Sequence, residues 1–182
     1  MKKQREIVLG VTGSIAAYKA CDLIRRLQDK DCNVSVIMTA NAEAFIAPLT
    51  LASISGRAVA RDLFEKNSDH WSMGHIELAK RAELLVIAPA TANIIAKIAH
   101  GFADDLLSCV AMATQAPILI APAMNTEMYW NKIFQENVVK LKKHGVHFVD
   151  PIKGKLACGD FGIGHLSEVE DIVKEALKIL KR

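Results

Sequence analysis

The sequence predicts a single α/β domain in which helices cover both faces of a parallel, doubly wound sheet of the Rossmann-like type. Short apolar runs, such as residues 7–11 and 84–88, alternate along the chain with segments that have the apolar spacing of helices. Uninterrupted apolar runs are typical of strands that are buried on both faces, as in parallel sheets. The length of 182 residues suits one such domain, spanning residues 1–182, around one core.

The predicted strands are apolar runs bounded by glycine, proline or polar turn residues. They lie at residues 7–11, 33–38, 84–88, 116–121 and 146–149. A helix at 15–28 joins the first two strands into a βαβ unit with a right-handed crossover. Further helical segments are expected at 39–43, 50–55, 75–80, 94–99, 104–113, 131–144 and 168–180. The polar segment 57–74 is expected to be a surface connection.

Composition limits the classes of partner. Lys and Arg number 23 against 20 for Asp and Glu, an excess too small and too scattered for nucleic acid, although it suits an anionic small molecule. No apolar run is long enough to span a membrane and no signal peptide is recognisable, so we expect a cytoplasmic protein without a membrane partner. The four cysteines are widely spaced without a CxxC pair, which favours free thiols over disulfides or zinc.

Small and polar residues follow three of the predicted strands. The turn Gly13-Ser14-Ile15 opens the first helix, where backbone N–H groups can bind a phosphate, although an ordinary tight turn is the alternative. Its spacing matches neither the GxGxxG fingerprint nor the GxxxxGK[ST] loop. Thr39 and Thr91-Ala92-Asn93 follow two other strands. The three turns are therefore expected at one edge of the sheet, around a cleft of mononucleotide size.

The stretch Pro122 to Trp130 lies between a predicted strand and a helical segment, again at this edge. Asn125 can both donate and accept hydrogen bonds, and Met128 adds apolar bulk beside it. The alternative is an ordinary helix start capped by Asn125 or Thr126. The two interpretations are compatible, because a capping residue can also face a substrate.

Two further side chains are candidates for proton transfer. His75 follows Gly74 at the expected start of a helix, whose positive end favours a neutral imidazole that can act as a base; a cap or surface residue is the alternative. The other histidines show no ligand spacing with it, so no metal site is predicted. Cys158 lies in the glycine-rich segment 153–164, which suggests a mobile flap whose thiol can donate a proton.

Five segments together resemble the homo-oligomeric flavin-containing cysteine decarboxylases, in order along nearly the whole chain. They are Gly13 to Lys19, His75 to Ala79, Ala88 to Asn93, Pro122 to Met128 and Ala157 to Asp160. Within that family they are most similar to the enzymes that act on 4′-phosphopantothenoylcysteine in coenzyme A biosynthesis. The Pro-Ala-Met-Asn and Ala-Cys-Gly-Asp segments are the specific ones, whereas the first glycine turn alone is not.

The resemblance implies a flavodoxin-like fold, bound FMN, and a homo-oligomer built from trimers, with a dodecamer as one candidate size and flavin sites at subunit interfaces. It implies that the FMN phosphate lies near Gly13, Ser14 and Ile15. The other implied cofactor contacts are Thr39, Thr91, Ala92, Asn93, Ile94 and Ala123.

The reaction of this family explains the remaining residue types. FMN oxidises the CH₂–SH end of the substrate to a thioaldehyde, whose C=S group takes up the electrons released when carbon dioxide leaves. The resulting enethiol is reduced to 4′-phosphopantetheine. His75 matches the family's active-site base and Cys158 its proton donor in the reductive half. Asn125 and Met128 match its substrate contacts, with Asn125 orienting the carboxylate and amide.

The sequence departs from the family pattern in two places. His165 stands where relatives usually have arginine, which removes a permanent charge and a bidentate fork, so the resemblance assigns it no role. Many bacterial relatives also continue into a synthetase domain, whereas this chain ends at Arg182. The initial methionine and the terminal helical segment favour a stand-alone decarboxylase over an excised domain.

Three related functions are the alternatives. A peptidyl-cysteine decarboxylase of lantibiotic maturation releases the enethiol and needs no flap cysteine, so Cys158 argues against it. A flavin prenyltransferase shares the fold but is not expected to combine Pro122 to Asn125 with Cys158. A non-catalytic, FMN-binding regulatory protein that inhibits a phosphatase often carries a long acidic tail, and none is present in this sequence.

Overall fold

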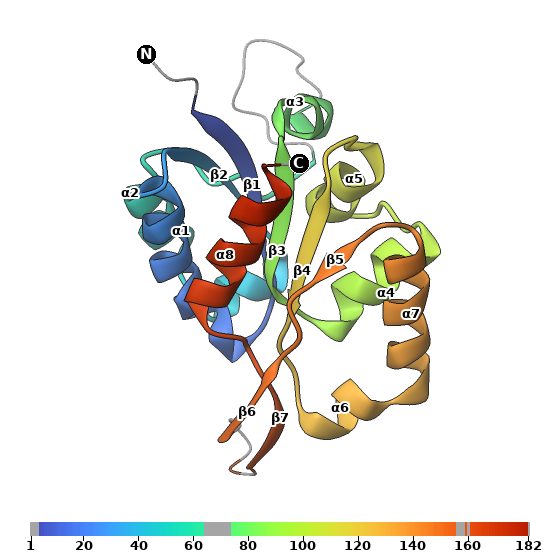
Figure 1. Cartoon of the computed structure of the whole chain (residues 1–182). Helices are drawn as coiled ribbons and strands as arrows, with labels where there is room; N and C mark the ends of the chain where they lie inside the picture. The colour runs from blue at the N-terminus through green and yellow to red at the C-terminus, as the bar shows by residue number, and fades with distance from the viewer. Residues whose placement is uncertain (1–3, 64–73, 156–158, 160, 182) are drawn as a thin grey trace.

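A five-stranded parallel sheet forms the centre of the computed structural model, which describes residues 4–63, 74–155, 159 and 161–181. The strands are β1 Arg5–Val11, β2 Cys32–Met38, β3 Leu84–Ala90, β4 Ile118–Pro122 and β5 His147–Phe148. Their order in the sheet is β2-β1-β3-β4-β5 (Figure 1). Because β1 lies between β2 and β3, the chain reverses its direction of travel across the sheet there, which is where such folds place ligands.

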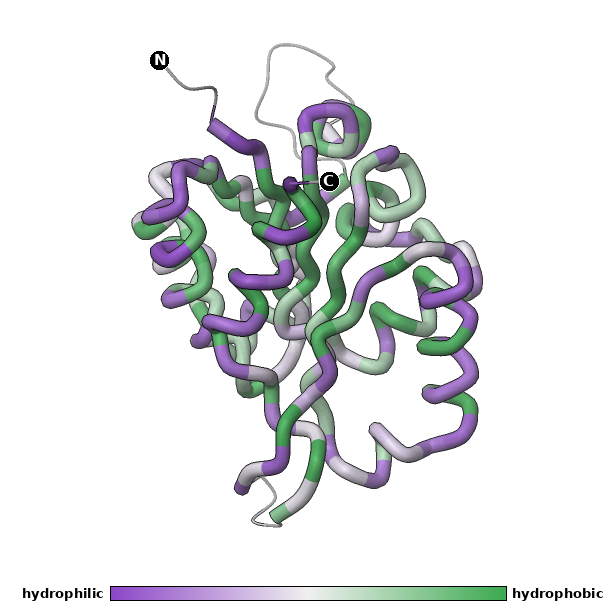
Figure 2. The backbone as a smooth tube through the Cα atoms, in the orientation of Figure 1, coloured by the Kyte–Doolittle hydropathy of each residue, from purple (hydrophilic) through white to green (hydrophobic). Residues whose placement is uncertain are grey.

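Helices cover both faces of this sheet, as predicted. One face carries α1 Ala20–Gln28, α2 Pro48–Ser55 and α8 Val169–Ile179, and the other carries α3 Gly74–Arg81, α4 Ala92–His100, α5 Leu106–Ala113 and α7 Lys132–Lys143. Alternation along β1 builds the two layers, since Ile7 and Leu9 pack in the first and Val8 packs in the second. Figure 2 shows the strands as a nearly continuous apolar centre, with hydrophilic residues on the outer turns of the helices.

Local sequence chemistry sets most helix ends. Gly56 and Gly101 end α2 and α4 with positive φ values of 70° and 74°. Thr91 and Asp105 cap the starts of α4 and α5 through their side chains. Pro48, which interrupts the apolar pattern in the sequence, is the first residue of α2, a position where its missing N–H costs nothing.

Three short helical segments refine the predicted ones. The helix expected at 15–28 begins as the 3₁₀ helix η1 Ile15–Lys19, and the turn after β2 is the 3₁₀ helix η2 Ala40–Ala44. The separate helix α6 Thr126–Trp130 precedes α7.

The glycine-rich segment 153–164 is predicted to be a mobile flap, and residues 153–155 and 161–164 belong to an antiparallel β-hairpin that the sequence did not predict. The strands are β6 Ile152–Lys155 and β7 Phe161–His165, which pair with each other as a separate two-stranded sheet. The glycines carry no strand periodicity, so this pairing could not be predicted from local pattern. Cys158 lies outside the described residues.

Polar side chains at the amino end of the sheet bind one another. The Glu6 carboxylate accepts hydrogen bonds from Asn33 at 2.7 Å and from Arg57 at 3.1 Å. The hydroxyl of Ser35, which is 5% exposed, accepts from Arg57 at 3.0 Å and from Arg81 at 2.6 Å. This network joins β1 and β2 to α3 and to the start of segment 57–63.

Candidate active site

The turns after β1 and β3 are held together by one buried hydroxyl. Thr12, which is 1% exposed, donates its hydroxyl hydrogen to the Pro89 carbonyl at 2.7 Å and accepts from the Thr91 N–H at 3.0 Å. The Ala123 N–H donates to the Ala90 carbonyl at 3.0 Å and joins the end of β4 to the same place. The carboxyl ends of the three central strands therefore form one fixed platform.

The turn after β1 also approaches the turn after β2 closely. A Cβ atom on Gly13 would lie 2.5 Å from the Cβ of Asn41, so only glycine fits without a shift of the backbone. Ser14 caps η1, since its side-chain oxygen accepts from the Ala16 N–H at 3.3 Å. The fold thus brings the predicted residues Gly13, Ser14 and Thr39 to one edge.

Two cavities open at this edge, and the predicted site residues are divided between them. The cavity of about 480 Å³ is bordered by the turns after β1, β2 and β3. Its predicted residues are Gly13, Thr39, Thr91, Ala92, Asn93, Ile94 and Met128. The cavity of about 400 Å³ lies toward η1 and the hairpin, and its predicted residues are Ser14, Ile15, Ala123 and Asn125. The β1 turn contributes to both cavities.

Asn125 combines the two roles that its sequence position left open. It is the N-cap of α6, where its side-chain oxygen accepts from the Glu127 N–H at 2.8 Å, and it borders the 400 Å³ cavity. Met128, its predicted partner in substrate binding, borders the other cavity and is half exposed. Within one chain, the two residues therefore belong to adjacent cavities rather than to one.

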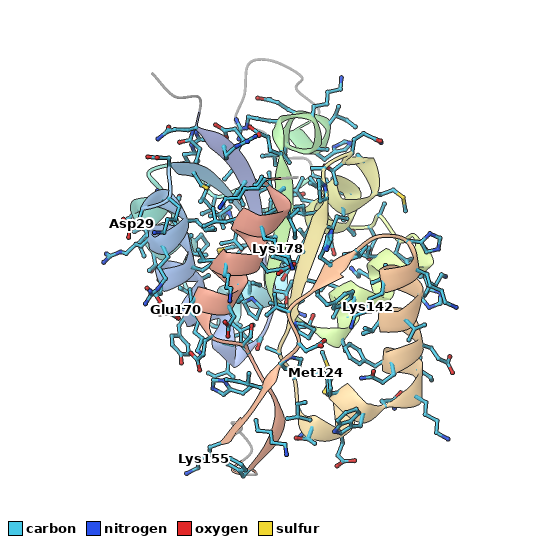
Figure 3. All side chains as sticks on the ribbon, in the orientation of Figure 1. Asp29, Met124, Lys142, Lys155, Glu170 and Lys178 are labelled. Atoms are coloured by element: carbon cyan, nitrogen blue, oxygen red, sulfur yellow. The ribbon has the colours of Figure 1, made fainter. Side chains whose placement is uncertain are left out.

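The β6–β7 hairpin is attached to the same region. The Met124 N–H donates to the Gly164 carbonyl at 3.0 Å, and the Thr126 hydroxyl donates to the Ile163 carbonyl at 2.7 Å. A Cβ on Gly164 would lie 2.1 Å from the Met124 carbonyl oxygen, so the glycine permits this close approach. Figure 3 labels Met124 at the end of β4 and Lys155 on the hairpin beyond it.

Three basic residues border the 400 Å³ cavity, and sequence reasoning gave none of them a role. They are Lys19 on η1, Lys155 on β6 and His165 on β7. Lys19 lies in the segment that carries the family resemblance, but the hairpin residues could be placed at the cavity only once the pairing of β6 with β7 was known.

A charged cluster borders the 480 Å³ cavity and was also missed. Lys97 binds Asp104 at 2.8 Å and Asp105 at 2.7 Å. Burial alone would raise the pKa of the Asp105 carboxyl, but the hydrogen bonds from Lys97 and Ser108 outweigh it and lower that pKa. The Asp105 carboxylate is thus paired with Lys97, and it also caps α5.

His75 lies far from these cavities within one chain. It is the second residue of α3, which lies at the end of the sheet where β1 begins, opposite the hairpin (Figure 1). His75 is not among the described residues that line either cavity. One copy of the chain therefore does not bring His75 and Asn125 together.

The sequence also predicts free thiols, no metal site and no membrane span. Burial raises the pKa of the thiols of Cys21, Cys32 and Cys109, which is typical of unreactive structural cysteines. Within the described ranges, no group of three or more His, Cys, Asp or Glu side chains could hold a metal ion. No helix in that part of the chain has the length and apolar character needed to cross a membrane.

Sequence comparison relates almost the whole chain to known proteins. A family model described as Flavoprotein matches residues 1–181. The coenzyme A biosynthesis bifunctional protein CoaBC of Haemophilus influenzae is 48% identical over 168 residues, which are 92% of this chain and 42% of that protein. The chain therefore spans less than half the length of this curated relative.

Solved structures agree with the sequence comparison over the full fold. A PPC decarboxylase, crystallised as a cysteine-to-serine mutant complexed with pantothenoylaminoethenethiol, superposes with a TM-score of 0.86 at 31% identity, covering 99% of this chain and 100% of that one. The FMN-dependent cysteine decarboxylase SpaF superposes with a TM-score of 0.85, also at 31% identity, covering 98% of each chain.

Proposed function

This chain belongs to the Flavoprotein family, and from that premise we propose that it is an FMN-dependent carboxy-lyase that converts 4′-phosphopantothenoylcysteine to 4′-phosphopantetheine in coenzyme A biosynthesis. The observation that carries the proposal is the position of Asn125, which borders a cavity together with Ser14, Ile15 and Ala123. The carboxamide of Asn125 suits a substrate carboxylate, and the turn beside it suits a cofactor phosphate. The 48% identity to CoaBC selects coenzyme A biosynthesis.

The residues at the carboxyl edge fit FMN. The close packing of Gly13 on Asn41 leaves no room for a side chain and fixes the turn, and the backbone N–H groups at the start of η1 suit a phosphate. Hydroxyl and amide groups of Thr39, Thr91 and Asn93 border the larger cavity and supply hydrogen-bonding partners. Ala92, Ile94 and Ala123 would add apolar contacts. When bound, FMN would supply the hydride transfers that oxidise the substrate thiol carbon and later reduce the enethiol.

The chain's own residues orient the substrate and move protons. Asn125 would hold the substrate carboxylate and amide, in a position fixed by its capping bond to Glu127. Met128 would provide an apolar contact from the first turns of α6. Cys158 would deliver a proton in the reductive half of the reaction. The similar PPC decarboxylase is a cysteine-to-serine mutant that holds an enethiol, which supports a late role for a cysteine.

His75 would act as the base from a neighbouring subunit. The separation of α3 from the hairpin within one chain means that His75 can reach Asn125 only across an interface between copies (Figure 1). This arrangement supports the proposed homo-oligomer built from trimers, with flavin sites at the subunit interfaces. Exposed apolar side chains at the two cavities, including Ile15, Tyr18 and Met128, would be covered in such an assembly.

A peptidyl-cysteine decarboxylase is the second candidate, because SpaF, an FMN-dependent cysteine decarboxylase, is as similar in structure as the PPC decarboxylase. The two functions differ in their product. The peptidyl enzymes of this family release the enethiol, whereas the proposed enzyme reduces it, and Cys158 is the residue that favours reduction.

One assay tests the proposal directly. The purified protein, loaded with FMN, is incubated with 4′-phosphopantothenoylcysteine, and the products are weighed by mass spectrometry. Loss of carbon dioxide without net loss of hydrogen is the expected result. A product two hydrogens lighter would indicate an enethiol-releasing enzyme, and no reaction by the FMN-loaded protein would refute the decarboxylase function.

The variant Cys158→Ser separates the two halves of the reaction. Substrate oxidation and loss of carbon dioxide are expected to continue, while the enethiol accumulates and the flavin absorbance stays bleached. Cys109→Ser is the matched control. The Cys109 thiol donates to the Ala103 carbonyl just before α5, and Cys109 is not among the described residues that line either cavity. Normal product from Cys158→Ser would remove the assigned role of this cysteine.

A further inference from the structure

The 400 Å³ cavity has an unusual distribution of charge. Lys19, Lys155 and His165 border it, and none of its described lining residues is an Asp or a Glu. The remaining lining is mostly apolar, with Ile15, Met124 and Leu166 among its members. Such a cavity suits a ligand with an uncharged body and one strongly anionic end, because the cations have no carboxylate of the protein among the lining residues to neutralise them.

The His165 ring is fixed so that one nitrogen remains available. Its Nδ1 lies 3.0 Å from the Leu166 carbonyl oxygen, and since a carbonyl only accepts, Nδ1 carries the hydrogen. Nε2 is thereby left for a ligand, and it donates when the ring is protonated. A Cβ on Gly154 would lie 3.3 Å from both Cβ and Cγ of His165, so the ring packs against β6 at this glycine. The hairpin thus packs His165 against Gly154, the residue before Lys155 on β6, and both His165 and Lys155 border the cavity.

We propose that Lys155 and His165, together with Lys19, bind the phosphate monoester of the substrate. This inference rests on the proposed function, which supplies a substrate with a carboxylate at one end and a phosphate at the other. Asn125 borders the same cavity and would take the carboxylate. The Lys155 ammonium provides charge-assisted hydrogen bonds to phosphate oxygens, and the His165 ring borders the same cavity from the adjacent strand, in place of the arginine that relatives usually have at position 165.

FMN also carries a phosphate, and the positions of the residues favour the substrate. Most neutral donors expected for the cofactor, such as Gly13, Thr39 and Thr91, border the other cavity, whereas Ser14 and Ile15 border this one from the start of η1. Lys155 and His165 belong to the hairpin, which extends beyond the sheet edge from the point where Met124 binds Gly164 (Figure 3). The hairpin therefore meets the cavity where β7 contacts Met124 and Asn125, whereas the Ser14-Ile15 turn expected for the cofactor phosphate borders it from η1.

Calorimetric titration of the FMN-loaded protein with 4′-phosphopantetheine and with pantetheine tests the inference without requiring turnover. The wild type is expected to bind the phosphorylated compound at least tenfold more tightly. Lys155→Gln and His165→Asn should each reduce this preference about tenfold, because each removes a hydrogen bond to a charged group. His165→Arg should preserve the preference. Lys153→Gln, which removes the same charge from the same strand outside the cavity lining, should leave it unchanged.

Each other outcome has a definite meaning. Equal binding of the two compounds by the wild type, or an equal loss of preference in Lys153→Gln, would overturn the inference. If Lys155→Gln or His165→Asn instead weakened FMN but not riboflavin in a flavin fluorescence titration, the cations would bind the cofactor phosphate and the inference would be wrong. A preserved preference for phosphate in a protein that decarboxylates nothing would refute the proposed function alone.

Discussion

Polar side chains at the two ends of the parallel sheet differ in what they contact. At the amino end, Glu6, Ser35, Arg57 and Arg81 bind one another across β1, β2 and α3. At the carboxyl end, the polar residues of the turns border two cavities, and a hydroxyl such as that of Thr39 makes no side-chain bond to cap its helix. The amino end is completed by its own chain, whereas polar groups at the carboxyl end border cavities that we propose hold ligands, even where some of them also cap helices.

The difference teaches that hydrogen-bonding capacity distinguishes a structural edge from a binding edge better than polarity does. Both ends contain charged and hydroxyl side chains. Thr114 near the amino end and Thr12 at the carboxyl end even make the same two kinds of hydrogen bond. Each hydroxyl donates to a carbonyl and accepts from an N–H. Thr12, however, fixes the turns that face the cavities, and Thr114 fixes only α3 against the chain that leads into β4.

The largest effect is expected from Gly13→Ala, which adds a methyl group where the turn after β1 packs against the turn after β2. The added Cβ would collide with Asn41, at a cost of about 3 kcal/mol in the free energy of unfolding. FMN should also bind at least tenfold more weakly, as measured by fluorescence titration. Gly74→Ala is the control for stability, because a Cβ there has no atom within 4 Å. Unaltered FMN binding by Gly13→Ala would remove the turn from the cofactor site.

Thr12→Val should follow, at about 2 kcal/mol measured by urea denaturation. The isosteric change leaves the Thr91 N–H without its partner, and the Pro89 carbonyl keeps only the 3.3 Å hydrogen bond from the Thr12 backbone N–H. FMN retention should fall with stability, because the turns after β1 and β3 lose their connection. Thr114→Val removes the same two kinds of hydrogen bond in a less buried position, and it should cost less and leave FMN retention intact. Equal loss of FMN in both variants would break the comparison of the two ends.

Glu6→Gln tests the amino end itself. The change removes the negative charge that faces Arg57 at 3.1 Å and Arg81 at 3.8 Å, while keeping the shape of the side chain. We expect a loss of about 1 kcal/mol in unfolding free energy, since the pairs are partly exposed and therefore screened. Decarboxylation and FMN binding should not change. A decrease in decarboxylation or in FMN binding would show that the amino end contributes to function in addition to positioning α3.

The smallest effect, about 0.5 kcal/mol at neutral pH, is expected from Asp105→Asn. The lowered pKa of Asp105 means that its stabilising charge is fully present above the ordinary carboxyl pKa near 4 and is lost as the pH falls through the lower folded value. The difference in urea midpoint between wild type and variant should therefore be constant from pH 7 to about pH 5 and shrink in more acidic buffer. A difference that grew in acid would contradict the assigned sign.

The strands and most helix ends could be predicted because their causes are local. The apolar runs gave all five strands of the main sheet, and residues such as Gly101 and Thr91 marked the ends of α4 through their own backbone or side-chain chemistry. Gly13, Thr39 and Thr91, the proposed cofactor contacts, could be grouped in advance, since the carboxyl ends of parallel strands share one edge.

What could not be predicted depends on contacts between distant parts of the chain. Ser35 meets Arg81 across 46 residues, and no local pattern marks this pair. The hairpin that carries His165 has glycines in place of alternating apolar residues, so its pairing with the strand that carries Lys155 could not be predicted. The separation of His75 from Asn125 likewise follows from the position of α3, which the sequence does not reveal.

That separation has a consequence for genetics. If each site combines the His75 of one copy with the Asn125 of another, a chain lacking the imidazole and a chain lacking the carboxamide are each inactive alone. Mixed assemblies of the two would nevertheless contain some interfaces at which both intact residues meet. Two null alleles of this gene would then complement each other when expressed together, as alleles of a single-chain enzyme do not.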